Sequence, residues 1–553
     1  DADKATSGVT IDSTGSTVTA TSTASQNATA LSLGNDKDST VTVNGGKFVA
    51  AGEGTGVAVD LGNTTAISSG TVASNITFND SSIAKESAKG YAISSKKLLT
   101  AVKDQATGVT DNISLKNTSV TGSSLFQAID GSANKSKLNG NKTYTANLNL
   151  DASSVDGSLN VKATGIQGKT TAALNATLDN ASSLKGNVNV TAVKPAKTSG
   201  TSAASASVTL KNGSSWEGNI AGNTTTGSTG NPKTFTENQS ATVSLSDSTW
   251  KGNVGDGLDG GARVTLKNSS WTGDVSNAKT AVVLTDGSVW NGAINSNSVA
   301  ESRAVAAAGS TGAGTVTPST LTGQTVALAG STWNVTGDSS VQGVTAVNST
   351  ISVKDASLTT QVLSAKDSNL VVDAGTTNAL NVTGKATGNV TVYNAGTVDL
   401  KDAKTAFITV GEGSDLKAKG TTEGGLYQYD LEQGADGNFY FVKNESQLSN
   451  ASSVIQAMAA APANVANLQA DTLSARQDAA RLSANDDGGV WVQYFGGKQK
   501  HTTAGNAAYN LDVNGVMVGG DTRVKTDDGS WLAGVAMSSA KGDMTTMQSK
   551  GDT

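Results

Sequence analysis

One short stretch of this 553-residue chain resembles the motif of a catalytic serine. The sequence GDSS at 337–340 offers a serine of the kind that serine proteases and GDSL-type lipases use. Both of those enzyme classes need a histidine as general base. His501 is the single histidine, and it lies in the C-terminal segment beyond a predicted helix. GDSS also lacks the glycine or leucine that should follow it, so we expect a structural turn there and neither activity.

Carboxylates are more numerous, and paired carboxylates with a nearby cation are suited to polysaccharide cleavage. The candidates are Asp247, Asp256, Asp259, Asp274 and Asp286, with Arg263 and Lys267 nearby. They recur at the period of the repeat described below, which indicates structural corners rather than one catalytic cluster. A polysaccharide-cleaving enzyme stays as the weaker alternative, and we expect no enzyme activity. GDGLDGG at 255–261 lacks the nonapeptide repeat of calcium-binding β-rolls, so no metal or cofactor is expected either.

The bulk composition narrows the class of protein further. A formal charge of −6 offers no nucleic-acid signature, and no nucleic-acid partner is expected. The absence of cysteine excludes disulfides and thiolate metal sites. The sequence contains no run of eighteen apolar residues, so it predicts no transmembrane helix. The chain starts at DADKATSG without an apolar targeting run, so we expect that a signal peptide has been removed.

A short phrase recurs along the chain and must position any functional residue. It alternates apolar and polar residues, continues with Asn or Asp and one or two small residues, and ends on a large apolar residue. Five copies end on tryptophan: Trp216, Trp250, Trp271, Trp290 and Trp333. Other copies end on Phe48, Ile83, Val120, Val155, Leu184, Ile351 and Leu370.

The spacing of these phrases predicts the fold. From Trp250 to Leu370 the intervals are 21, 19, 43, 18 and 19 residues, and the 43 is close to two periods with one degenerate copy. Upstream intervals of 29 to 37 residues indicate the same unit with inserted loops. A period of about 20 residues with alternating strands is typical of a parallel β-solenoid. We therefore predict an all-β chain in which residues 1–420 form a right-handed parallel β-helix of three strands per turn, with the tryptophans in one interior column. Separate β-sandwich domains are the alternative.

Two sets of polar residues recur in this solenoid and are candidate binding residues. The Asx set would occupy a corner, where its side chains tolerate left-handed turns or offer acceptors to an extended polypeptide; it comprises Asn79, Asp80, Asn117, Asp151, Asp179, Asn180, Asn212, Asp247, Asn268 and Asp286. The basic set would face a sulfated polysaccharide; it comprises Lys116, Lys211, Lys251, Arg263 and Lys267. Plain turn satisfaction and solvated surface lysines are the alternatives to these two functions.

The pattern changes toward the C-terminus. GGLYQYDLEQGADGNFYFV at 424–442 is a hairpin signal, and we expect 421–445 to cap the solenoid. The Ala-rich segment 446–486 predicts a linker helix, interrupted at Pro462. Segment 487–553 alternates in the manner of outer-membrane strands, with Trp491, Tyr494 and Trp531 as an aromatic girdle. Three or so strands cannot close, so we expect this segment to be the incomplete start of an outer-membrane β-barrel.

This order of parts is that of a type V autotransporter, and the chain resembles the AIDA/pertactin group over its whole length. The most specific parts are LYQYDLEQGADGNFYFV, similar to the autochaperone end of that family, and GGVWVQYFGGKQKHTTAGNAAYNLDVNGVMVGGDTRV, similar to its barrel start. The resemblance implies export through the periplasm, display at the outer membrane and cell surface of a Gram-negative bacterium, and usually adhesion or self-association. For the members most similar to this chain it implies binding of glycosaminoglycans and of fibronectin.

We therefore expect a surface adhesin that binds host extracellular-matrix protein, such as fibronectin, and glycosaminoglycans through extended faces of the β-helix. A self-associating protein that promotes cell aggregation and biofilm is the second hypothesis.

Overall fold

The computed structural model describes residues 8–34, 38–63, 65–102, 105–132, 139–193, 200–223, 237–295, 323–373, 379–396, 406–483, 487–503 and 507–546. The chain forms two compact units. Residues 1–392 with 407–417 make the first, and residues 393–406 with 418–553 make the second. None of the helices among the described residues is long and apolar enough to cross a membrane.

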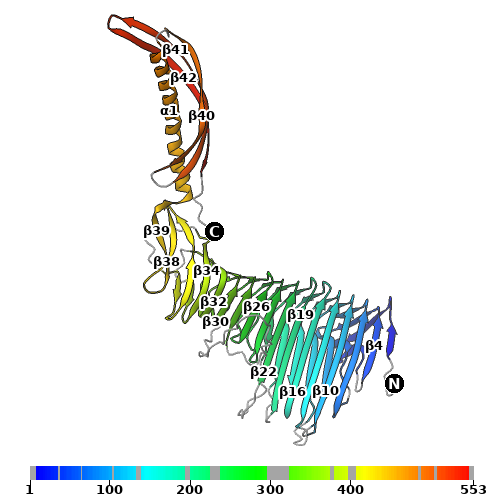
Figure 1. The fold of residues 1–553 in the computed structure, drawn as a ribbon. Coiled ribbons are helices and arrows are strands. Elements are labelled where there is room, and N and C mark those ends of the chain that lie inside the picture. Colours follow the sequence, from blue (N-terminus) through cyan, green and yellow to red (C-terminus); the bar gives the residue numbers. More distant parts are fainter. Residues whose placement is uncertain are drawn as a thin grey trace. The chain divides into compact units, whose positions relative to one another are not determined.

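The first unit is a parallel β-helix built from three series of strands (Figure 1). The long-strand series comprises β1 (Val9–Asp12), β4 (Ser39–Asn44), β7 (Gly70–Asn79), β10 (Ala106–Lys116), β13 (Asn141–Asp151), β16 (Gly168–Asp179), β19 (Gly200–Leu210), β22 (Glu237–Ser246), β24 (Gly261–Lys267), β26 (Thr280–Thr285), β28 (Thr325–Ala329), β30 (Ser339–Val347) and β32 (Leu358–Val372). Each strand of this series pairs in parallel with the next, so successive turns stack rung on rung.

The short-strand series follows a corner of every rung. It comprises β2 (Thr17–Ser22), β5 (Lys47–Gly52), β8 (Ser82–Lys85), β11 (Ser119–Thr121), β14 (Ser154–Asp156), β17 (Ser183–Lys185), β20 (Ser215–Glu217), β23 (Thr249–Lys251), β25 (Ser270–Thr272), β27 (Val289–Asn291), β29 (Thr332–Asn334) and β31 (Thr350–Val353). The last rungs add β33 (Leu380–Val382), β34 (Ala386–Asn394), β35 (Ile408–Val410) and β36 (Asp415–Lys419).

The third series explains why the N-terminal rungs are longer. It comprises β3 (Ala28–Ser32), β6 (Thr55–Asp60), β9 (Lys89–Leu99), β12 (Ser124–Asp130), β15 (Leu159–Thr164), β18 (Val188–Val193) and β21 (Ile220–Gly222). After β21 it is reduced to single bridges at Val254, Val275 and Ile294, and continuous pairing resumes where the first residues of β30 pair with those of β32. The long strands shorten over the same span, from 12 residues in β16 to 6 in β26. The upstream intervals therefore reflect longer strands and a full third sheet, in addition to any loops.

The interval of 43 residues is also corrected by the structure. Trp290 and Trp333 are direct partners in the pairing of β27 with β29, so they belong to neighbouring rungs. The extra residues form one insertion between β27 and β28, and most of them, 296–322, lie outside the described part of the chain. Spacing could not reveal this because an insertion and a degenerate repeat lengthen an interval equally.

The five tryptophans lie in one interior column. Neighbouring indole rings stack with centroids 4.7–4.8 Å apart and planes within 3–5° of parallel. Leu184 pairs with Trp216 at one end of the stack, and Ile351 with Trp333 at the other. This spacing equals the separation of hydrogen-bonded strands, so rings on successive rungs come into contact through backbone pairing alone.

Each indole also binds the backbone of the preceding rung. Trp271 Nε1 donates to the carbonyl oxygen of Gly252 at 2.8 Å, and the other four rings make the same bond at 2.9–3.0 Å. The accepting glycine lies two residues after the column residue. A Cβ built on Gly252 would stand 1.9 Å from the carbonyl oxygen of Gly218, so the glycines allow close stacking of the rungs.

A buried hydroxyl ladder stabilises the corner beside this column. The backbone N–H of Thr118 donates to Ser153 Oγ at 2.9 Å, and that of Ser153 donates to Ser182 Oγ at 3.0 Å. The same contact recurs at the C-terminal end, where Ser331 N–H donates to Ser349 Oγ. These bonds satisfy amides that the turn leaves outside the strand ladders.

The second unit contains antiparallel strands and one helix. β37 (Thr421–Gly424), β38 (Tyr427–Gln433) and β39 (Phe439–Leu448) form an antiparallel sheet in which Tyr429, Phe439 and Phe441 are buried. Helix α1 (Asn450–Leu482) packs on the antiparallel sheet of β40 (Gly488–Thr502), β41 (Ala508–Thr526) and β42 (Gly529–Thr546). Arg476 of α1 makes a bidentate ion pair with Asp521 of β41.

Two expectations for this unit were wrong. The helix continues through Pro462, because its packing against the sheet outweighs one lost backbone bond. Trp491 packs toward the helix, whereas Tyr494 and Trp531 are exposed at 66% and 73%. Side chains alternate along a strand, so residues 491 and 494 of β40 cannot lie on one face. The fold class itself, a parallel β-helix followed by a helix and antiparallel strands, is confirmed.

Candidate functional site

The long strands of the β-helix end at a corner made by left-handed residues. The backbone angle φ is +50° at Asp80, +47° at Asn117 and +44° at Asn268, and it is also positive at Asn180, Asn212, Asp247 and Asp286. Asn and Asp tolerate this conformation better than other non-glycine residues. Their side chains leave the corner outward and are exposed.

The ten predicted Asx residues occupy two columns, which corrects the single ladder expected from the sequence. Seven are the left-handed corner residues. The other three, Asn79, Asp151 and Asp179, end their long strands one position earlier. The corner holds one left-handed residue in most rungs, so adjacent Asn–Asp pairs in the sequence divide between the strand end and the turn.

Hydrogen bonds between rungs already occupy many of these side chains. Asn117 Nδ2 donates to Asp80 Oδ1 at 2.6 Å, Asn212 to Asp179 at 2.7 Å, and Asn268 to Asp247 at 2.7 Å. The bonds from Asn268 and Ser246, with the charge of Lys267, hold the pKa of Asp247 below its usual value. Each carboxylate nevertheless keeps further acceptor capacity toward solvent, since it has two oxygens.

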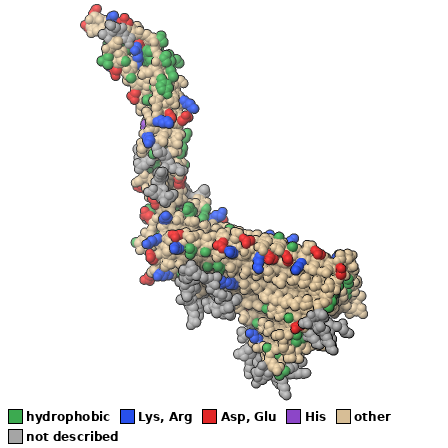
Figure 2. Space-filling view, turned by 45° about the vertical axis from the view of Figure 1, so that its right-hand side comes forward, with side chains coloured by type: hydrophobic (Ala, Val, Ile, Leu, Met, Phe, Trp, Pro, Cys, Tyr) green, Lys and Arg blue, Asp and Glu red, His purple; other side chains and the backbone are tan. Residues whose placement is uncertain are grey.

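Three of the five predicted basic residues lie within the Asx columns instead of forming a separate surface. Lys116 is in register with Asn79 on one side and Asp151 on the other. Lys211 follows Leu210, whose partner is Leu178, so it lies beside Asp179. Lys267 approaches Asp286 to 4.0 Å. Figure 2 shows that cations and carboxylates are mixed along an edge of the β-helix.

The remaining two basic residues lie elsewhere. Lys251 is on the short-strand face and approaches Glu217 to 3.7 Å. Arg263 is half-buried on the long-strand face, in register with Thr242 and Ala281. The basic set therefore does not line one groove. These residues were grouped because they recur at similar spacing in the sequence. That spacing does not show on which face of a strand each side chain lies.

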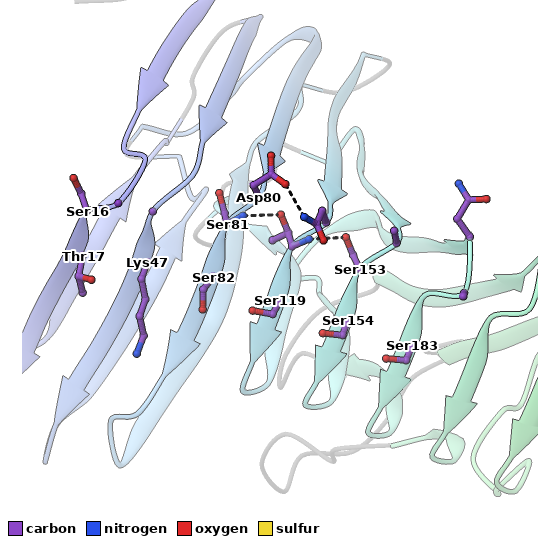
Figure 3. Close-up of a pocket in the computed structure, with 17 residues that line it drawn as sticks. Ser16, Thr17, Lys47, Asp80, Ser81, Ser82, Ser119, Ser153, Ser154 and Ser183 are labelled. Carbon is purple, nitrogen blue, oxygen red and sulfur yellow. Dashed lines mark hydrogen bonds between the residues drawn. The ribbon is translucent and has the colours of Figure 1, made fainter.

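A column of hydroxyl groups was missed by the sequence analysis. Ser82, Ser119, Ser154, Ser183, Ser215, Thr249 and Ser270 follow one another in register along the short strands. Together with the corner residues, the first four line a shallow groove of about 800 Å³ (Figure 3). The signal was available, because each of these hydroxyl residues immediately precedes the large apolar residue of its phrase.

A charge ladder runs beside the hydroxyl column. Asp156, Lys185, Glu217 and Lys251 are exposed and consecutive in register, so their signs alternate from rung to rung. A second groove, of about 460 Å³, lies over Lys185, Glu217 and Lys251. On the long-strand face four asparagines form another ladder, in which Asn112 donates to Asn75, Asn147 to Asn112 and Asn175 to Asn147 at 2.7–2.9 Å.

The residues weighed for catalysis have structural partners. Asp338 of GDSS accepts hydrogen bonds from the backbone and the hydroxyl of Ser357 at 2.9 and 2.8 Å, and its pKa is lowered by them. Ser339 Oγ donates to the carbonyl of Gly337. His501 belongs to β40 of the other unit, where its ring contacts Gln499 and Tyr509. In the described ranges, no three His, Cys, Asp or Glu residues are grouped so as to hold a metal ion.

Comparison with known proteins finds one family model and several similar proteins. Residues 490–553 match the family model described as the Autotransporter beta-domain. The putative uncharacterized protein YaiT of Escherichia coli strain K12 is 34% identical over 166 residues, which are 29% of this chain and 17% of that protein. The BrkA autotransporter of Bordetella pertussis is 27% identical over 234 residues, or 39% of this chain and 23% of BrkA. The chain thus spans less than a quarter of the length of these curated relatives.

Among solved structures, the autotransporter UpaB from E. coli strain CFT073 is 29% identical with a TM-score of 0.37, over 79% of this chain and 83% of that one. The Haemophilus influenzae Hap adhesin is 15% identical with a TM-score of 0.23, over 74% and 59%.

Proposed function

The chain is an autotransporter of the outer membrane and cell surface, and on that basis we propose that its β-helix is an adhesin for host extracellular-matrix protein, such as fibronectin. The proposed ligand is an extended segment of that protein, bound along the corner and the adjoining hydroxyl column. Glycosaminoglycan is the second proposed ligand.

The observation that carries this proposal is the interleaving of opposite charges at one edge. Lys116 lies between Asn79 and Asp151, and Lys267 lies beside Asp286. An extended polypeptide presents donors, acceptors and charges of both signs, and such an edge complements it. The rungs repeat at about 4.8 Å, so a straight segment would meet equivalent groups along its whole length.

Exposed lysines support the proposal that glycosaminoglycan is a ligand. The side chains of Lys251 and Lys267 are 75% and 66% exposed, and Lys116 and Lys211 are exposed as well. Because carboxylates stand beside several of these lysines, the net field toward a polyanion is weak. Binding to heparin should therefore be modest and should be lost at moderate salt, because salt screens exposed ion pairs.

The matrix-protein proposal is tested with the full chain on immobilised fibronectin. Changing Asp80, Asp247 and Asp286 together to Asn removes three charges and keeps residues that tolerate the left-handed corner. A charge-assisted hydrogen bond contributes about 1.5–3 kcal/mol, so losing even one should weaken binding about tenfold or more. Asp512→Asn, on β41 of the second unit, is the control. Unchanged affinity of the triple variant, or no binding by the parent chain, would refute the proposal.

The glycosaminoglycan arm is tested on a heparin column. Changing Lys116, Lys211 and Lys267 to Gln should move elution to lower salt, whereas Lys162→Gln, on the third series of strands, should not. Equal shifts for both variants would mean that binding is non-specific.

Self-association is the second candidate function, and the charge ladder favours it. Read along the axis, Asp156, Lys185, Glu217 and Lys251 run negative, positive, negative, positive. Two copies placed antiparallel would bring Asp156 opposite Lys251 and Lys185 opposite Glu217, twice each. The face is thus complementary to itself.

Inverting all four charges gives a specific test of this candidate. The inverted chain stays complementary to itself but sets like charges against the parent ladder. Sedimentation should therefore detect association within each population and none between them. Mixed complexes, or a parent chain that is monomeric at all concentrations, would exclude the ladder as a self-association surface.

A further inference from the structure

Two lysine–aspartate pairs are enclosed in the N-terminal rungs of the β-helix. Lys97 Nζ lies 3.2 Å from Asp111 Oδ1, with the two side chains 1% and 0% exposed. Lys142 Nζ lies 3.3 Å from Asp130 Oδ1, and both side chains are fully buried. Ions at such depth are costly unless hydrogen bonds satisfy their remaining acceptors and protons. The two pairs differ in how far this condition is met.

Asp130 is surrounded as an ionised carboxylate should be. Its Oδ1 accepts from the backbone and the hydroxyl of Ser132, and its Oδ2 accepts from the backbone N–H groups of Ile166 and Gln167 at 2.8 and 2.7 Å. Lys142 in turn donates to the carbonyls of Gly140 and Gln167. Each oxygen thus has two donors besides the lysine, so hydrogen bonds satisfy the buried carboxyl group.

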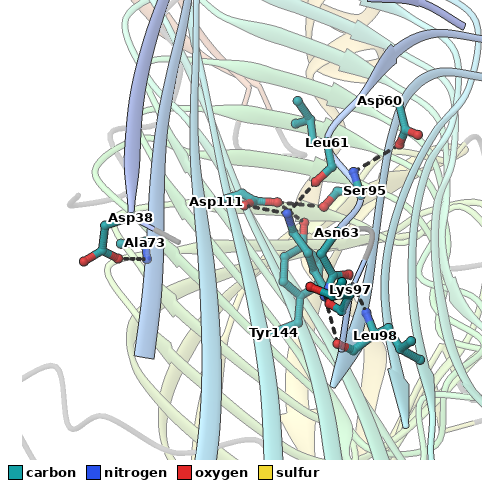
Figure 4. A network of polar contacts seen from close by, with 12 residues as sticks. Asp38, Asp60, Leu61, Asn63, Ala73, Ser95, Lys97, Leu98, Asp111 and Tyr144 are labelled. Atoms are coloured by element: carbon teal, nitrogen blue, oxygen red, sulfur yellow. Dashed lines mark hydrogen bonds and ion pairs between the residues drawn. The ribbon is translucent and has the colours of Figure 1, made fainter. Parts of the chain in front are cut away.

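Asp111 has a different environment (Figure 4). Its oxygen Oδ2 accepts hydrogen bonds from Ser95 Oγ at 2.7 Å and from Tyr144 OH at 3.0 Å. None of the described residues donates a hydrogen bond to Oδ1, although Lys97 Nζ stands 3.2 Å away. Lys97 Nζ donates instead to the carbonyl of Leu61. The amine therefore lies against a carboxyl group whose nearer oxygen is otherwise unengaged.

We propose that Lys97 and Asp111 condense to an amide, an isopeptide cross-link between β9 and β10. A proton passes from the ammonium to Oδ1, which leaves a neutral amine and a neutral acid, the forms that burial favours. The amine lone pair attacks Cγ, and negative charge develops on Oδ2, where the Ser95 and Tyr144 hydroxyls already donate. A second proton from the nitrogen goes to Oδ1, the Cγ–Oδ1 bond breaks, and one water leaves. One C–N bond replaces one C–O bond, so no oxidant or other reactant is needed.

The surroundings fit the product as well as the reaction. The new amide oxygen is Oδ2, which keeps both hydroxyl donors, and the new N–H retains the Leu61 carbonyl as acceptor. Burial raises the pKa of Tyr144 well above its usual value, so its hydroxyl stays protonated and continues to donate. The linkage would join β9 of the third series covalently to β10 of the long-strand series.

The test is the intact mass of the folded full chain, followed by peptide mapping. We expect a mass one water below that of the sequence, and a branched peptide that joins Lys97 to Asp111. Lys97→Arg keeps the charge but cannot condense, so it should have the full mass. Lys142→Arg is the matched control and should keep the one-water deficit. Tyr144→Phe removes a donor to Oδ2 and should leave a mixture of linked and unlinked chains.

The parent chain decides the proposal even where a variant fails to fold. A full mass for the folded parent chain overturns it. So does a one-water deficit that maps to any other pair, Lys142–Asp130 included. A deficit that maps to Lys97 and Asp111 and is absent from the unfolded, freshly synthesised chain supports it.

Discussion

Replacing Trp271 by alanine should loosen the middle of the tryptophan column. Trp271 is fully buried, stacks on Trp250 at 4.8 Å and on Trp290 at 4.7 Å, and donates to the Gly252 carbonyl. Loss of a buried Trp side chain costs about 3–5 kcal/mol in transfer and cavity energy. The abandoned carbonyl oxygen adds to that cost.

The stability of stacked repeats is approximately a sum of rung and neighbour terms, so a single unfolding energy describes such a unit poorly. Hydrogen exchange of individual backbone segments in the full chain is the better assay. A loss of 3–5 kcal/mol corresponds to roughly two to four orders of magnitude in local protection. We expect this loss in β23, β25 and β27, and little change in β7 and β10.

The control is Trp531→Ala, which removes a ring that is 73% exposed in the other unit. It should leave protection of the β-helix unchanged. If Trp271→Ala also leaves β23 and β27 protected, the indole column does not hold neighbouring rungs together, and the reasoning from stacking is wrong.

Three further changes follow from the same geometry. Gly252→Ala places a methyl group 1.9 Å from the Gly218 carbonyl oxygen and should open the same rungs to exchange, because backbone must move. Asn268→Ala loses the hydrogen bond to Asp247 and places alanine in a left-handed conformation, so it should lower the stability of the β-helix by about 1–2 kcal/mol. Asn268→Gly should lower it much less, because glycine adopts positive φ readily. Equal losses for the two variants would contradict the turn argument. Burial raises the pKa of Tyr144 above 10.0, so the folded β-helix keeps a proton that the unfolded chain releases. Stability should be level below about pH 10 and fall as the pH rises beyond it, and Tyr144→Phe should flatten that fall in alkaline denaturation.

Many of the interior residues could be predicted from the repeats alone. A large apolar residue at one place in every phrase must face one interior, because parallel rungs in register superimpose equivalent positions. The left-handed corner was also predictable, because most copies have Asn or Asp at the turn and these residues tolerate positive φ. Glycine also stands two positions after four of the five tryptophans, but its role could not be predicted because it depends on the carbonyl of the neighbouring rung.

The candidate surfaces were less predictable. Asn79 and Asp80 are neighbours in sequence yet belong to different columns, and Lys116 and Lys251 occupy different faces. A strand's period of two sends adjacent residues to opposite sides, so a shift of one residue in the assumed strand end reassigns every side chain. The same effect placed Trp491 and Tyr494 on opposite faces of one strand.

The sequence by itself determined that the chain winds into stacked rungs, that its indoles share one interior column, and that a helix and antiparallel strands follow. These are repeating, local properties, and a repeat carries its own register. Only the tertiary structure decided which outward residues become neighbours, how charges interleave at the corner, and that Lys97 meets Asp111 and Tyr144 in the interior. Those contacts join residues of different rungs and different series of strands, and the folded backbone alone brings them within reach.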